Sequence, residues 1–505
     1  MGRVRSAAKN ITFGYIGQFA TALVSFVLRK IFILYLADNL LGINSTYTNV
    51  LSILSMAELG IGTALNYALY APVARGDIEK IKSYMQMYRK AYLAIGGVVA
   101  VIGTCLAPFL RYLVKNPGVS VRELELYYFI FLFNTVSTYF VAYKYSLCNA
   151  EQRNYIQTNI NTITKLVVSG LQIVMLILTK NFVLYLLTDA VVQLVQKIFV
   201  SHYLDRRYPY LKEKNVQPLS KEESGEIWRK TRALVLHKVG DVARLQTDAL
   251  IISAFIEVSV AGLVDNYMLV MNTVTNFVGI IFNSLISGFG NLIATESKER
   301  QYSMFGVYRF FASWIYGFAV TGFFVLLTPL IRLFFGDRWV LPQGALILIL
   351  IDLYFKGDRI VLSNFKTAAG VFEEDKYLAI IQGIVNLILS IALVQKIGLA
   401  GIYVGTVVSG LIANVTKPVI IYRVCFEKSA LPYFIDTAKY ALVTAAAIGV
   451  NLLISRSVIA NLNIGTFLLM AIIITVIFNG VFLLLFRKTE AFEYLEGLVK
   501  RKLKR

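Results

Sequence analysis

The sequence has few of the side chains that build disulfide frameworks and metal centres. Among its 505 residues are three cysteines and two histidines. Cys105, Cys148 and Cys425 are far apart and match neither a disulfide pattern nor a metal-ligand spacing. His202 and His237 alone do not support a histidine-based metal site. We therefore expect no metal and no cofactor.

Catalytic motifs are also missing from the sequence. No Walker A loop is present, so we expect that this chain does not hydrolyse ATP. No nucleophile motif stands out either, and the predicted external loops are short. A membrane glycosyltransferase or polymerase usually carries its chemistry on large external loops. We therefore predict that the protein is not an enzyme.

Apolar residues dominate the sequence instead. The chain is 57% hydrophobic, with a mean hydropathy of +0.65. A helix needs about 20 apolar residues to cross roughly 30 Å of hydrocarbon, and most apolar runs here reach that length. The sequence predicts an all-α polytopic membrane protein. Fourteen spans are expected by hydropathy, at 11–37, 43–70, 88–113, 124–147, 156–179, 181–203, 233–256, 264–290, 305–334, 340–365, 377–396, 399–423, 435–456 and 463–486.

The net charge of +20 is concentrated in short connections between these spans. Alternate connections, such as "ADNLLGI" and "IEVSVAGL", are nearly free of cations. The positive-inside rule then places both termini in the cytoplasm. The charge distribution is thus explained by membrane topology, and we expect no nucleic-acid partner.

The longest connection divides the predicted spans into two groups. A weak repeat supports this division, because 33–50 aligns with 253–270 and pairs Gly42 with Gly262. Two six-helix lobes in parallel repetition are a common transporter plan. The predicted organisation is an N-lobe with spans 1–6 (1–203), a basic cytoplasmic linker (204–232), a C-lobe with spans 7–12 (233–424), spans 13 and 14 (425–487) and a basic cytoplasmic tail (488–505).

Two adjacent cations, Arg29 and Lys30, lie inside the first predicted span. A charge near the bilayer centre costs from about 3 to more than 10 kcal/mol. Helical spacing places Arg29 at the end of a polar row, whereas Lys30 is rotated away and can extend towards a membrane surface. We predict that Arg29 faces protein or water. The row also contains Gly14, Gln18, Thr21 and Ser25.

Three further predicted spans carry polar rows. The second contains Glu58 and Asn66, for which pairing with a buried cation and a polar helix–helix contact are both open interpretations. Lys165, in the fifth span, adds a cation to the proposed wet interior. The seventh span carries Lys238, Asp241, Arg244 and Asp248, and the tenth carries Asp352, Lys356, Arg359 and Lys366. In the seventh, a structural ladder of intrahelical pairs is the alternative for the first two residues.

These rows predict a water-filled cleft of mixed charge, weighted towards the positive. Such a cleft favours an anionic substrate, and the planar guanidinium of arginine suits phosphate. We predict substrate binding by Arg29, Lys30, Arg244, Lys356, Arg359, Gln18 and Asn66. Ion coupling or charge pairing is predicted for Glu58, Asp241 and Asp248.

Three blocks of sequence resemble the bacterial polysaccharide transporters, a family of the MOP exporter superfamily. Residues 29–77 resemble the first two spans of that family. Residues 237–270, with "GFGNLIATES" (288–297), resemble its seventh and eighth spans. The resemblance extends over nearly the whole chain in span count and loop layout.

The resemblance implies two six-helix lobes around a V-shaped cavity and alternating access. It implies a flippase in the bacterial cytoplasmic membrane that moves undecaprenyl-diphosphate-linked oligosaccharide to the outer leaflet. Related flippases place a cationic residue on the first span, which Arg29 matches. Implied partners are the lipid-linked oligosaccharide, membrane lipids and enzymes of polysaccharide biosynthesis.

Other functions stay open at this point. A MATE-type antiporter of organic cations has the same fold but needs acidic cavity residues, whereas the polar rows here are mostly basic. A membrane glycosyltransferase or polymerase is a weaker alternative, and a non-transporting scaffold has only the basic tail in its favour.

Overall fold

The computed structural model describes residues 2–213, 216–229, 231, 246–371 and 373–503. Among them, eleven helices are long and apolar enough to cross a membrane. The predicted all-α polytopic fold is confirmed. The chain forms two compact units, Met1–Gly262 (unit 1) and Leu263–Arg505 (unit 2), and each is described by itself.

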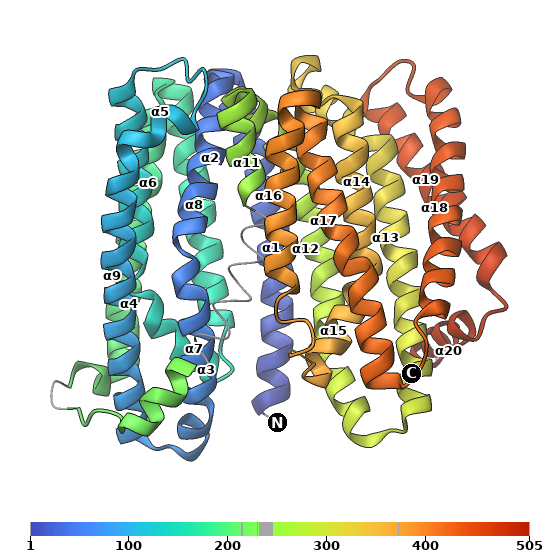
Figure 1. The fold of residues 1–505 in the computed structure, drawn as a ribbon. Coiled ribbons are helices and arrows are strands. Elements are labelled where there is room, and N and C mark those ends of the chain that lie inside the picture. Colours follow the sequence, from blue (N-terminus) through green and yellow to red (C-terminus); the bar gives the residue numbers. More distant parts are fainter. Residues whose placement is uncertain (1, 214–215, 230, 232–245, 372, 504–505) are drawn as a thin grey trace. The chain divides into compact units, whose positions relative to one another are not determined.

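Unit 1 is a bundle of helices (Figure 1) with many large apolar side chains exposed on its surface, as expected for contact with lipid. Helix α1 packs along α8, and α9 packs against both α6 and α8. The helices of this unit include α1 (Gly2–Tyr35), α2 (Asp38–Leu54), α3 (Met56–Arg75), α4 (Ile78–Leu106), α5 (Leu110–Leu113), α6 (Val121–Thr138), α7 (Tyr145–Ala150), α8 (Tyr155–Thr179), α9 (Phe182–Arg207) and α11 (Thr247–Ile251), followed by the first residues of α12 (Val258–Thr295).

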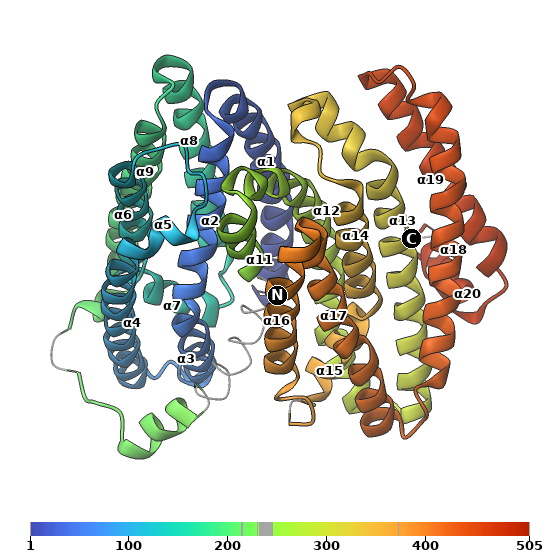
Figure 2. The ribbon, with the colours of Figure 1, turned by 45° about the horizontal axis from the view of Figure 1, so that its top comes forward.

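Unit 2 contains most of α12 and the helices that follow it. Helices α18 and α19 lie side by side next to α13, and α20 packs against α13 (Figures 1 and 2). The bounds are α13 (Lys298–Phe335), α14 (Gln343–Asp358), α15 (Ile360–Ala369), α16 (Leu378–Ile397), α17 (Leu399–Ile421), α18 (Leu431–Val458), α19 (Ile464–Phe486) and α20 (Glu490–Leu503).

Two predicted spans are divided into separate helices. The second span breaks at Ser55, between α2 and α3, where the serine hydroxyl donates to the Leu51 carbonyl at 2.8 Å. Such bonding to the preceding turn bends helices. The tenth span breaks at Arg359, which separates α14 from α15. Glu58 and Asn66 of the second span therefore lie on α3, whereas the row of the tenth span is divided between α14 and α15.

The C-terminal segment, for which the sequence predicts a basic cytoplasmic tail, contains a helix. Residues 490–503 form the amphipathic helix α20. Its Ala491, Phe492 and Leu495 pack against a cluster built on Phe310 and Phe482. Apolar residues at helical spacing within the charged segment account for this helix.

The two glycines paired by the weak internal repeat contact each other within unit 1. A Cβ placed on Gly262 would lie 3.0 Å from the backbone nitrogen of Gly42. One placed on Gly42 would lie 1.7 Å from the carbonyl oxygen of Val258. Thr46 and Ser253 share a hydrogen bond of 2.5 Å beside this crossing. Only glycine allows α2 and the start of α12 to approach so closely.

This crossing predicts a strong effect of one added methyl group. Gly42→Ala must displace backbone, so we expect it to lower stability by about 1–3 kcal/mol or more and to reduce the yield of folded protein. Gly97→Ala is the matched control, because Gly97 on α4 has no atom within 4 Å of an added Cβ. Thermal unfolding of both variants in detergent gives the comparison, and equal stability would contradict the close packing.

Candidate functional site

A polar cavity of about 420 Å³ lies inside unit 1, among helices of the membrane-spanning part. Eleven of its fourteen lining residues have amide, hydroxyl or charged side chains. Buried polar surface of this kind in a membrane protein marks a water-filled path or a binding site. We call it the amide cavity. Its lining residues are Glu58, Thr138, Val141, Ala142, Tyr145, Gln157, Asn161, Thr164, Lys165, Val168, Asp189, Gln193, Gln196 and Lys197.

Two neighbouring helices supply most of the polar wall, and they do so with the same spacing. On α8 the polar positions are Gln157, Asn161, Thr164 and Lys165. On α9 they are Asp189, Gln193, Gln196 and Lys197. Both sets follow i, i+4, i+7, i+8, which places four side chains on one face of a helix.

A hydrogen-bond network on α6 and α9 fixes one side of this wall. Lys197 is 6% exposed, and its Nζ donates to the Asn134 carbonyl (2.7 Å), the Asn134 amide oxygen (2.8 Å) and the Ser137 hydroxyl (2.8 Å). Asn134 in turn donates to Asp189 at 2.9 Å. Asp189 also accepts from Gln193 at 2.9 Å. Opposite charges of α9 are thus bridged by one asparagine, and the buried ammonium is fully hydrogen-bonded.

Two more charged residues, Glu58 and Lys165, line the amide cavity. The Tyr92 hydroxyl donates to Glu58 at 3.1 Å. Lys165 is exposed at the cavity, and among the residues that the structure describes it makes no hydrogen bond and no ion pair. An ammonium in a membrane-spanning helix requires water or a ligand. The cavity therefore presents one available cation surrounded by amides and hydroxyls.

The predicted residues of the first span lie on α1, outside the lining of the amide cavity. Gln18 and Arg29 are half-buried, whereas Lys30 is exposed. Gly17, next to Gln18, lets α1 approach α8, because a Cβ there would lie 2.6 Å from the Thr162 hydroxyl. The difference in burial between the two adjacent cations agrees with the predicted rotation of the helix. Their roles stay predictions.

The other predicted residues of unit 1 are distributed over two helices. Glu58 lines the amide cavity. Asn66 is half-buried on α3, and its amide oxygen has no hydrogen-bond partner among the described residues. Asp248 is half-buried on α11. Arg244 and Asp241 lie outside the described residues.

The predicted cations of unit 2 have partners within their own unit. Lys356 pairs with Asp352, one turn away on α14, at 2.6 Å. Arg359 is 7% exposed and donates to the Gly410 carbonyl at 3.1 Å and to the Asn414 amide oxygen. These bonds hold the break between α14 and α15 against α17.

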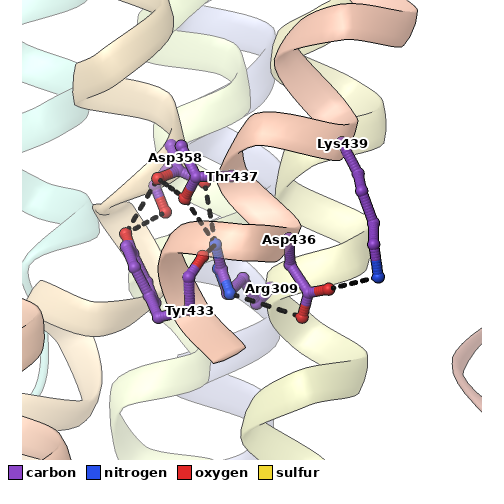
Figure 3. Close-up of polar contacts among 6 residues, drawn as sticks. All are labelled: Arg309, Asp358, Tyr433, Asp436, Thr437 and Lys439. Atoms are coloured by element: carbon purple, nitrogen blue, oxygen red, sulfur yellow. Dashed lines mark hydrogen bonds and ion pairs between the residues drawn. The ribbon is translucent and has the colours of Figure 1, made fainter. Parts of the chain in front are cut away.

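A cluster of buried charged and polar side chains in unit 2 joins α13, α14 and α18 (Figure 3). Arg309 Nη2 donates to the Tyr433 carbonyl and the Thr437 hydroxyl, each at 2.6 Å, and lies 3.6 Å from Asp358. Asp358 accepts from the Tyr433 and Thr437 hydroxyls at 2.9 Å. The guanidinium also stacks 3.5 Å from the Tyr433 ring centroid. We call this group the arginine cluster, and it attaches α18 to the rest of unit 2.

Sequence reasoning missed the residues of α9 and the arginine cluster. The row Asp189, Gln193, Gln196, Lys197 has the helical spacing that identified the other polar rows, so the sequence contained a usable signal. Arg309 stands alone in an otherwise apolar part of the ninth predicted span. Its partners come from other helices, which helical spacing cannot identify.

The arginine cluster predicts a large cost for losing one of its members. Arg309→Ala leaves Asp358 buried without its cation, so we expect a loss of about 3–5 kcal/mol in stability. The paired change Arg309→Met with Asp358→Leu removes both charges and should cost less. Arg332→Ala is the control, since its pair with Asp337 is 52% and 89% exposed and such pairs contribute under about 1 kcal/mol. If thermal unfolding shows that R309A is as stable as R332A, the stabilising role of the arginine cluster is contradicted.

Comparison with known proteins gives results at the level of the fold. No protein-family model matches the sequence, and a search of curated proteins finds no match. Among solved structures, lipid II flippase MurJ in an inward closed conformation matches with a TM-score of 0.68 at 13% identity, over 94% of this chain and 99% of that chain.

Two multidrug transporter structures match as well. An inward-facing MATE family transporter of the MOP superfamily has a TM-score of 0.62 at 16% identity, over 83% of this chain and 95% of its own. A Vibrio cholerae MATE transporter has a TM-score of 0.56 at 16% identity, over 86% and 99%. At these identities the likeness establishes the fold: the predicted fold shared with the MATE and lipid II flippase structures is confirmed, and the placement among polysaccharide transporters stays a prediction.

Proposed function

We propose that this protein is a flippase for undecaprenyl-diphosphate-linked oligosaccharide, carrying it by alternating access from the cytoplasmic to the outer leaflet of the bacterial cytoplasmic membrane. The amide cavity is the observation that carries this proposal. A sugar headgroup presents many hydroxyls, each of which donates and accepts hydrogen bonds. A wall of amides, hydroxyls and paired charges matches that chemistry.

Within the amide cavity, the α8 and α9 rows are the proposed contacts of the sugars. Gln157 and Asn161 offer both donors and acceptors from α8. Gln196 donates to the Tyr145 hydroxyl at 3.2 Å and keeps its carbonyl oxygen for a ligand. The Lys197–Asn134–Asp189 network holds α9 in place, so these contacts are preorganised.

Cations are the proposed contacts of the diphosphate. Lys165 supplies the available ammonium of the amide cavity. Arg29 supplies a guanidinium whose two parallel donors fit phosphate oxygens. Further proposed contacts of the diphosphate are Lys30, Arg244, Lys356 and Arg359. Gln18 and Asn66 are proposed as uncharged contacts of the substrate. Glu58, Asp241 and Asp248 are proposed for ion coupling, because no nucleotide site was found in the sequence.

The extent of the structural likeness supports a flippase over a drug antiporter. The lipid II flippase structure covers 94% of this chain, whereas the inward-facing MATE structure covers 83%. Cation antiport by the same fold is the second candidate, because Glu58 and Asp189 place carboxylates at the amide cavity. Drug susceptibility of a deletion strain tests it: hypersensitivity with normal surface polysaccharide would favour the antiporter.

Removal of the available cation should impair transport without unfolding the protein. In a strain that depends on this protein, Lys165→Ala should lower surface polysaccharide about tenfold or more, since a hydrogen bond to a charged group contributes about 1.5–3 kcal/mol. Lys396→Ala is the matched control, because Lys396 is an exposed lysine at the end of α16 in unit 2. Wild-type polysaccharide from K165A at equal expression would remove Lys165 from the substrate path.

Arg29 gives an independent test of diphosphate recognition. Arg29→Ala should abolish most of the polysaccharide output in the same strain, and Arg29→Lys should restore only part of it. Lysine keeps the charge but cannot make two parallel hydrogen bonds to one phosphate. Full activity of R29K with loss in R29A would show that charge alone suffices, and full activity of both would exclude Arg29 as a substrate contact.

A further inference from the structure

The connection after α9 is fastened to α4 within unit 1. Its described residues, 208–213 and 216–229, form what we call the strap (Figure 1). Lys82 of α4 pairs with Glu213 at 2.5 Å, and Lys80 pairs with Glu223 at 2.5 Å. The Ser83 hydroxyl donates to the Gln217 carbonyl at 2.6 Å. The hydrogen bond from Lys80 lowers the pKa of the Glu223 carboxyl, so this contact stays charged at neutral pH.

A second cavity of about 540 Å³ lies between the strap, α4, α9 and the turn before α7. Positive side chains outnumber negative ones in its wall. Four cations line it (Lys82, Arg89, Lys144 and Lys212), against two carboxylates (Asp205 and Glu213). We call it the strap cavity.

Two of the four cations are neutralised inside the protein. Lys144, 6% exposed, pairs with Asp205 at 2.6 Å and donates to the Ser201 hydroxyl at 2.8 Å. Lys82 is paired with Glu213 in the strap. Arg89 and Lys212 are exposed, and neither makes a hydrogen bond or an ion pair within the described part of the chain. The strap cavity therefore carries two uncompensated positive charges, one from α4 and one from the strap.

Part of the remaining wall is apolar, and two of its apolar side chains also lie on the outer surface of the bundle. Leu93 and Phe140 line the strap cavity and are 40% and 57% exposed. Leu93 follows Arg89 by one helical turn, at the point where α4 changes from the charged sequence of 78–90 to the apolar sequence of 91–106. A membrane-spanning helix makes this change where hydrocarbon begins. The unpaired cation Arg89 thus lies one helical turn from an exposed apolar side chain at the edge of the cavity, as a phospholipid places its phosphate next to its acyl chains.

We propose that the strap cavity binds a phosphate-bearing anion, with the headgroup of an acidic membrane phospholipid as its source. Arg89 and Lys212 would hold the phosphate oxygens, and the acyl chains would follow Leu93 and Phe140 into the bilayer. Basic pockets between membrane helices bind acidic headgroups in this way. A bound phosphate would bridge α4 and the strap, and so hold the connection between the predicted lobes. This site is separate from the amide cavity and does not depend on the transported substrate.

Lipid retention by the purified full-length protein tests the proposal. Native mass spectrometry would measure retention of phosphatidylglycerol against phosphatidylcholine in mixed micelles. A parallel measurement with sodium pyrophosphate, at matched ionic strength, tests a soluble phosphate as the ligand. The site variant is Arg89→Gln with Lys212→Gln. The control is Lys221→Gln with Arg229→Gln. It also removes one lysine and one arginine, but from exposed positions of the strap outside the cavity.

We expect selective retention of phosphatidylglycerol by the wild type and the control, and about thirtyfold weaker binding by the site variant, because each basic residue near a membrane surface contributes about a factor of five. Hydrogen exchange of residues 208–213 in the wild type gives a readout that needs no substitution, and it should slow when phosphatidylglycerol is added. Protection by pyrophosphate but not by the lipid would support the site with a soluble phosphate as its source. Equal weakening in both variants, or no response to either probe, would overturn the proposal.

Discussion

Hydrocarbon cannot solvate charge, and this constraint decides where the polar residues of a membrane-spanning chain can lie. In the described structure the constraint is met by pairing across helices. Lys197 donates three hydrogen bonds and is linked through Asn134 to Asp189. Arg309 is surrounded by Asp358, Thr437 and the Tyr433 ring. Each network fixes which helices are neighbours: α6 with α9 in one unit, and α13 with α14 and α18 in the other.

Once these charges are paired, the few that remain available indicate function. Lys165 is exposed at a cavity whose other charged groups already have partners. The apolar parts of a polyprenyl carrier need no such cavity, because lipid solvates them. Its sugars and phosphates do, and the amide cavity provides hydrogen-bonding groups for them inside the membrane-spanning part. Paired charges thus stabilise the bundle, and the available cation is the proposed contact of the substrate.

Much of the fold was predictable because hydropathy depends on local sequence. The spans at 156–179, 181–203 and 463–486 agree with α8, α9 and α19 to within a few residues. The helix breaks at Ser55 and Arg359 were not predicted, because an apolar run does not show where backbone bonding is interrupted. The close approach of Gly42 and Gly262 depends on tertiary packing, and the weak repeat only aligned the two residues. The site was less predictable. Helical spacing identified Glu58, and a polar run in the fifth span identified Lys165, whereas Arg309 has partners up to 128 positions away in sequence.

Transbilayer movement of a lipid-linked oligosaccharide by the purified protein tests the central claim most directly. Proteoliposomes would contain undecaprenyl-diphosphate-linked oligosaccharide in both leaflets, and an impermeant sugar-modifying enzyme added outside would measure how much becomes accessible. The account predicts that the inner-leaflet pool becomes accessible within minutes in the presence of the protein and an ion gradient or membrane potential, and stays protected in protein-free vesicles. An inner-leaflet pool that stays protected in the presence of folded protein, under both driving forces, would contradict it.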